Sequence, residues 1–91
     1  MIAVYKYNLP TGDKPVLRVP GLLRWLHVGT QQGEPMVWGK VDTDGIVRDE
    51  GLFIRGTGHP FTGDEGRHLG SVLIASDPLV FHVFVPVWEE K

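Results

Sequence analysis

The sequence predicts a small all-β domain, a barrel or sandwich of six to seven short antiparallel strands, on three observations. Twelve glycines and seven prolines recur about every ten residues, which leaves little room for a helix. The segments between them are rich in the β-branched and aromatic residues that favour strands. The connections between these segments are short, as expected for one β domain spanning residues 1–91.

Turn residues set the bounds of each predicted strand, beginning at the N-terminus. Residues 2–8 alternate before the turn-rich stretch LPTGDKP, and residues 16–19 end at Pro20 and Gly21. The strands expected along the chain are residues 2–8, 16–19, 22–29, 35–41, 52–56, 68–75 and 79–87.

Three turns between these strands have recognisable sequences. The clearest hairpin uses QQGE at residues 31–34, where Gly33 accepts a positive φ angle. Asp44-Gly45 is a dipeptide favoured in type I′ turns, so that geometry is expected there. Ser76-Asp77-Pro78 separates the last two strands.

The last strand is apolar on both faces. In PLVFHVFVPVW the residues Leu79, Phe81, Val83 and Val85 share one face, while the other face carries Val80 and Phe84 beside His82. Such a strand is either central in a closed core or covered by another subunit, and the sequence leaves both open. A domain this short buries only about 60% of its unfolded surface, so we expect a homo-oligomer, such as a tetramer.

Composition excludes several classes of function. The net charge of −2 and the pI near 6.0 give no basic field for duplex nucleic acid, so a local cluster must hold any anionic ligand. The absence of cysteine excludes disulfides, thiolate zinc sites and cysteine nucleophiles. Neither a signal peptide nor a membrane span is expected, and a soluble cytoplasmic protein is predicted.

The segment FIRGTGHP, residues 53–60, raises the main functional question. Gly56-Thr57-Gly58 can present backbone N–H groups to an anion, and Arg55 adds a cation suited to phosphate. His59 can donate to an anion or stack on a base. The alternative is a bend at a strand end, where the glycines accept positive φ and Pro60 fixes the exit.

No motif for metal or covalent catalysis is present, so neither an enzyme nor a cofactor is expected. The adjacent acidic pairs Asp49-Glu50, Asp64-Glu65 and Glu89-Glu90 are interpreted as solvated loop charges. Ser71 and Ser76 lie in no GxSxG turn. The histidines lack ligand spacing. They are His27, His59, His68 and His82.

Aromatic residues beside cations are better candidates for a binding site. Flat rings close to basic groups can sandwich a nucleobase while its phosphate is held, although large rings also fill small β cores. The rings are Tyr5, Tyr7, Trp25 and Trp38, and the cations beside them are Lys6, Arg24 and Lys40.

Four segments, YKYNLP, VWGKVD, FIRGTGHP and LVFHVF, occur in this order along the chain. Together they resemble a family of small tailed-phage proteins of unassigned function, which has a YKY opening, a V-W-A-x-V-D strand, an I-x-GTGHP loop and a VFHVF end. Gly39 stands where that pattern has alanine. The family in turn is similar to phage sponge proteins that sequester cyclic-nucleotide signals of bacterial antiviral immunity.

This resemblance implies a phage-encoded, non-enzymatic homo-oligomer in the host bacterial cytoplasm that binds a small anionic nucleotide. Alternatives are a phage protein that inhibits a host protein through an apolar β surface and a structural or assembly component. In the implied site, the loop backbone and Arg55 hold phosphate, and Trp38 or a tyrosine stacks on the base. The residues implied are Tyr5, Tyr7, Trp38, Arg55, Gly56, Thr57, Gly58 and His59.

Overall fold

The computed structural model describes residues 1–10, 12–73 and 80–87, and confirms the all-β fold. Eight short strands form within these residues, each bounded by the glycines, prolines and polar turns that the sequence supplies. They are β1 (Ile2–Asn8), β2 (Val16–Pro20), β3 (Leu22–Gln31), β4 (Glu34–Asp42), β5 (Val47–Gly51), β6 (Phe53–Gly56), β7 (Arg67–Leu73) and β8 (Val80–Val85).

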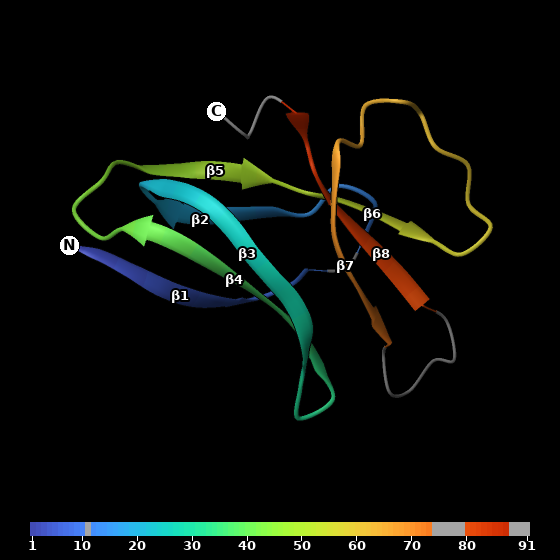
Figure 1. Ribbon diagram of the computed structural model, residues 1–91, viewed down its shortest axis with the longest axis horizontal. Helices are drawn as coiled ribbons and strands as arrows, with labels where there is room; N and C mark the ends of the chain where they lie inside the picture. The colour runs from blue at the N-terminus through green and yellow to red at the C-terminus, as the bar shows by residue number, and fades with distance from the viewer. Residues whose placement is uncertain (11, 74–79, 88–91) are drawn as a thin grey trace.

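The strands pair antiparallel in three sheets. Sheet A has the order β1-β4-β3, sheet B consists of β2 and β5, and sheet C has the order β6-β8-β7. In Figure 1, sheet C lies to the right of the other two sheets, and β8 runs between β6 and β7. The predicted hairpin of residues 31–34 is confirmed, because Gln32 and Gly33 between β3 and β4 both have positive φ.

The core lies between the sheets, where each contributes its inward-facing residues. Sheet C packs tightly against sheet A at Gly70, because a Cβ atom there would lie 2.7 Å from Val28 Cγ1. The glycine therefore lets β7 lie beside β3. The buried cluster is Leu9, Leu17, Val19, Trp25, Val28, Val37, Val41, Leu52, Ile54, Val72, Val83 and Val85.

Two expectations about the middle of the chain were wrong. Residues 47–51, which carry little alternation, form β5 and pair with β2, where Arg18 and Asp49 form an ion pair. A turn does follow β4, but Asp44 and Gly45 are not among the residues with positive φ, so it is not type I′. Gly45 N instead donates to Asp42 O at 2.9 Å.

The apolar character of β8 on both faces has an explanation within one chain. β8 is the central strand of sheet C, with Val83 and Val85 in the core. On its other face the Phe84 ring contacts the Phe61 ring, with centroids 5.1 Å apart. The homo-oligomer stays a prediction. The turn at Ser76-Asp77-Pro78 lies outside the described residues, as do Leu79 and the acidic pair at 89–90.

Candidate functional site

The outer face of sheet A, the face turned away from the core, places Trp38 among basic side chains. Trp38 and Lys40 alternate with the buried residues of β4 and therefore point outward. Lys6 of β1 lies directly opposite Trp38 on one side, and His27 of β3 lies opposite it on the other. The centroids of the His27 and Trp38 rings are 5.3 Å apart. A half-buried indole thus lies between two nitrogen-bearing side chains.

Two irregularities in β3 bring its basic residues to this face. The register with β4 shifts between Leu22 and Arg24 and again between Trp25 and His27. As a result Arg24 lies opposite Lys40 on the outer face, whereas Trp25 is only 2% exposed and faces the core. The sequence placed both tryptophans beside cations, but only Trp38 is available to a ligand.

The three cations of this face, Lys6, Arg24 and Lys40, form no ion pair with a carboxylate of the described residues. Lys6 Nζ donates to the neutral Gln31 side chain. Three cations around an accessible flat ring are the groups that hold a phosphate and stack a base. We define this surface, Lys6, Arg24, His27, Trp38 and Lys40, as the Trp38 face.

The Gly56-Thr57-Gly58-His59 segment forms a tight turn. His59 N donates to Gly56 O at 3.0 Å, and Gly58, the third residue of the turn, has a φ angle of 87°. Thr57 N donates to Val80 O at 3.3 Å. The Thr57 amide that was expected to bind phosphate is therefore already used within the fold, and the strand-end bend describes this geometry better than an anion nest.

Arg55 requires a correction, because it is not the exposed phosphate ligand that the loop suggested. Its side chain is buried, and its Nε donates to Glu65 Oε2 at 3.0 Å. Its Nη1 donates to the backbone oxygens of Ile54 and Asp13. The guanidinium also lies 5.1 Å from the centroid of the Phe53 ring. The Nε and Nη1 donors thus satisfy groups of the protein itself.

Glu65 was expected to be a solvated loop charge, and this was also wrong. Glu65 is 3% exposed and accepts hydrogen bonds from the backbone N–H groups of Thr62 and Gly63. Burial raises the pKa of Glu65, but the donors at Thr62, Gly63 and its own backbone outweigh burial and lower the pKa to about 2. The carboxylate is therefore ionised and ties residues 57–66 to the outer face of sheet C through Arg55.

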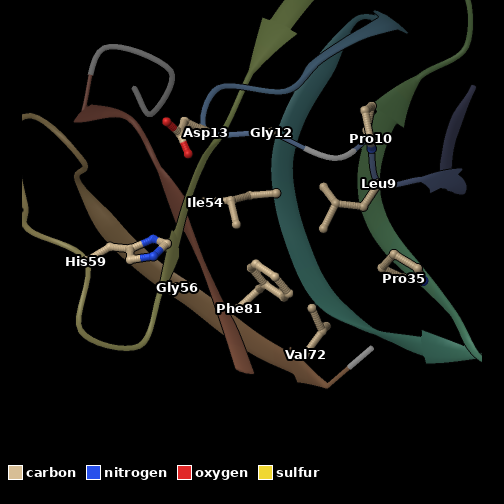
Figure 2. A pocket seen from close by; sticks show the side chains of 10 residues that line it. All are labelled: Leu9, Pro10, Gly12, Asp13, Pro35, Ile54, Gly56, His59, Val72 and Phe81. Carbon is tan, nitrogen blue, oxygen red and sulfur yellow. The ribbon is translucent and has the colours of Figure 1, made fainter. Parts of the chain in front are cut away.

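A pocket of about 110 Å³ lies between the inner faces of sheets A and C. Figure 2 shows His59 at its left side and Leu9 and Pro35 at its right. Because pockets for drug-sized ligands measure roughly 300 to 1,000 Å³, this one fits a group of only a few atoms. The residues that line it are Leu9, Pro10, Gly12, Asp13, Pro35, Ile54, Gly56, His59, Val72 and Phe81.

The two tyrosines implied as stacking residues lie on the other face of sheet A from Trp38. Tyr7 packs edge-on against Trp25, with ring centroids 6.1 Å apart, and burial raises the pKa of Tyr7. Tyr5 is 40% exposed and lies beside Tyr7. Within one chain, the tyrosines, the Trp38 face and the residue 56–59 turn therefore belong to three different surfaces.

A cluster that the sequence did not reveal lies on the outer face of sheet C. Ser71 of β7 and His82 of β8 are direct cross-strand partners, and Ser71 Oγ lies 2.8 Å from His82 Nδ1. His68 Nε2 lies 3.1 Å from the same hydroxyl. Alternation within each strand could place Ser71 and His82 outward, but only the strand register shows that they meet.

Comparison with known families supplies one match. A family described as a domain of unknown function (DUF7352) covers residues 1–91. The chain belongs to this family. The match agrees with the expectation of a family without an assigned function. No curated protein and no solved structure matches the chain.

No group of three or more histidine, aspartate or glutamate side chains in the described residues could hold a metal ion. The described residues also contain no helix long and apolar enough to cross a bilayer.

Proposed function

We propose that this protein sequesters a small nucleotide-type anion on the Trp38 face and does not alter the anion bound there. The base stacks on Trp38, and Lys6, Arg24 and Lys40 neutralise the phosphate. One observation carries the proposal. The indole points outward in a cross-strand row with Lys6 and His27, next to cations without carboxylate partners in the described residues.

The size and charge of this face favour a compact ligand. Three cations on one small sheet face match one or two phosphates, whereas the net charge of −2 opposes a long polyanion. A cyclic nucleotide combines a flat base with one or two phosphates. The resemblance to phage sponge proteins supports an immune signal of this class, bound by a homo-oligomer in the host bacterial cytoplasm.

Calorimetric titration with 3′,3′-cyclic GMP–AMP, cyclic di-AMP and cyclic AMP tests this proposal. We expect Trp38→Ala to weaken binding of the ligand by about tenfold to a hundredfold, because base–ring stacking contributes about 1 to 3 kcal/mol. Arg18→Ala is the matched control, because this exposed cation lies in sheet B and pairs with Asp49. Its affinity should equal that of the parent.

Other outcomes would contradict the proposed site, the proposed ligand class or binding without chemistry. Binding that is unchanged in Trp38→Ala places the site elsewhere, and the absence of binding for all three nucleotides removes sequestration of these ligands. Ligand released by heat denaturation should have its original mass, and a linear product would make the protein an enzyme. Capture of a host protein without any nucleotide would favour the alternative of a protein inhibitor.

A further inference from the structure

Four polar side chains form a continuous hydrogen-bonded row on the outer face of sheet C, away from the Trp38 face. Thr57 Oγ1 lies 3.0 Å from His82 Nε2, and His82 Nδ1 lies 2.8 Å from Ser71 Oγ. Ser71 Oγ in turn lies 3.1 Å from His68 Nε2. Ser71, Thr57 and His68 are exposed and His82 is half-buried, so solvent and small molecules reach the row.

One assignment of protons satisfies the whole row. The Thr57 hydroxyl donates to Val80 O at 3.5 Å, which leaves its oxygen to accept from His82 Nε2–H. His82 Nδ1 is then unprotonated and accepts the Ser71 hydroxyl proton. His68 Nε2–H donates to the Ser71 oxygen. The Ser71 proton therefore points at a base that a third group holds in the required tautomer.

We propose that Ser71 is an activated nucleophile, with His82 as its general base, that reacts with small esters and related electrophiles. A nucleophile within about 2.6 to 3.2 Å of a base that is itself oriented by another group is the arrangement that activates serine. Thr57 is a positioning residue, because it holds the far nitrogen of His82. His68 is a second positioning residue, because its Nε2–H donates to the Ser71 oxygen and orients the hydroxyl.

The reaction with a carboxylic ester has two stages, acylation of Ser71 and hydrolysis of the acyl group. Ser71 Oγ forms a bond to the carbonyl carbon while its proton passes to His82 Nδ1. The bond from that carbon to the alcohol oxygen then breaks, and His82 returns the proton to the departing alcohol. The product is Ser71 with an ester-linked acyl group. Water attacks this ester with the same base and releases the carboxylic acid.

Neighbouring residues point to a substrate with a short apolar acyl group. Phe84 lies in the next cross-strand row, opposite His68, and the two rings have centroids 5.3 Å apart. On the other side of Ser71, Leu73 lies opposite Val80 and is 56% exposed. Because Phe84 is only 8% exposed, an acyl chain bound at Ser71 would lie towards the exposed Leu73 side of the row.

Labelling with a small alkyl fluorophosphonate, followed by intact mass and peptide mapping, tests the proposal. Ser71 Oγ should displace fluoride from phosphorus and give a single adduct on the peptide that contains Ser71. Ser76 is the only other serine in the sequence and serves as an internal comparison. Ser71→Ala should remove the label, and His82→Ala should slow labelling by about a hundredfold.

Thr57→Val is the second variant, for use if His82→Ala does not fold. It replaces one exposed hydroxyl and should therefore leave the fold intact. We expect slower labelling and an altered pH dependence of its rate, since His82 Nε2–H loses its acceptor. The proposal is overturned by the absence of an adduct at Ser71, by equal labelling of Ser76, or by an unchanged rate in both His82→Ala and Thr57→Val. An adduct on a histidine nitrogen would also overturn it.

Discussion

Sheets A and C are both three-stranded, yet their outer faces differ. The outer face of sheet A has no cover from the described residues over Val4, which is 57% exposed, and it carries the unpaired cations of the Trp38 face. On the outer face of sheet C, residues 57–66 cover Phe84 and Arg55, which are 8% and 6% exposed, but leave Ser71 exposed. The same chain thus leaves the outer face of sheet A open and covers part of the outer face of sheet C.

This difference shows why a glycine-rich loop beside an arginine need not be a binding loop. In sheet C the buried Arg55 holds residues 57–66 against the sheet. Its Nε donates to Glu65, and its Nη1 donates to backbone oxygens. In sheet A the cations lie in strands without a distinctive motif, but they remain available to a ligand. Availability of the donors, rather than the type of residue, separates the two.

The largest expected effect comes from breaking the anchor of the covered face. Arg55→Ala leaves the buried Glu65 carboxylate without its cation, and such a loss costs about 3 to 5 kcal/mol of unfolding free energy. Urea denaturation measures it. Arg18→Ala removes an arginine from the exposed pair with Asp49 and should cost at most about 1 kcal/mol.

Equal losses in the two arginine variants would show that Arg55 does not hold the cover. A large loss in Arg55→Ala alone would instead explain any weakened ligand binding in that variant by unfolding. Binding measurements on Arg55 variants are therefore interpretable only beside their stability.

Acid should lower the stability of the protein by protonating Glu65, the partner of Arg55. The pKa of Glu65 is lowered from 4.5 to about 2, so the unfolded chain binds this proton more readily than the folded chain does. The stabilisation by Glu65 is complete above about pH 4.5 and is lost as the pH falls towards 2. The stability difference between the parent and Glu65→Gln should therefore be large at pH 7 and smaller at pH 3. A difference that does not change with pH would contradict the assigned pKa.

The sequence predicts the strands well because their signals are local. Turn residues and alternation located β1, β3 and β4 closely, and the 31–34 hairpin was correct. β5 was missed because its stability comes from pairing with β2, including the Arg18–Asp49 contact, and not from an apolar pattern of its own. Long-range pairing of this kind leaves no local signal.

The candidate site was harder to predict for the same reason. Trp38 with Lys6 and Lys40 follows from alternation once the strands are known, but Arg24 reaches that face only because β3 has two bulges. Burial of Arg55 depends on Glu65, ten residues away across a loop, which no spacing rule indicates. The meeting of Ser71 and His82 likewise depends on register.

The smallest expected effect concerns the cover itself. Phe61→Ala removes the edge-on ring contact with Phe84, and aromatic pairs of this kind contribute about 0.5 to 1.5 kcal/mol beyond area burial. Because Glu65 still ties the loop to Arg55, the variant should fold and lose about that amount in urea denaturation. Val4→Ala on the open face of sheet A is the control, and surface changes of this kind stay within about 0.5 kcal/mol. If Phe61→Ala and Val4→Ala lose equally little unfolding free energy, the Arg55–Glu65 ion pair alone holds residues 57–66 and Phe61 adds nothing. If Phe61→Ala loses as much as Arg55→Ala, these residues are held by the Phe61 ring and not by the ion pair.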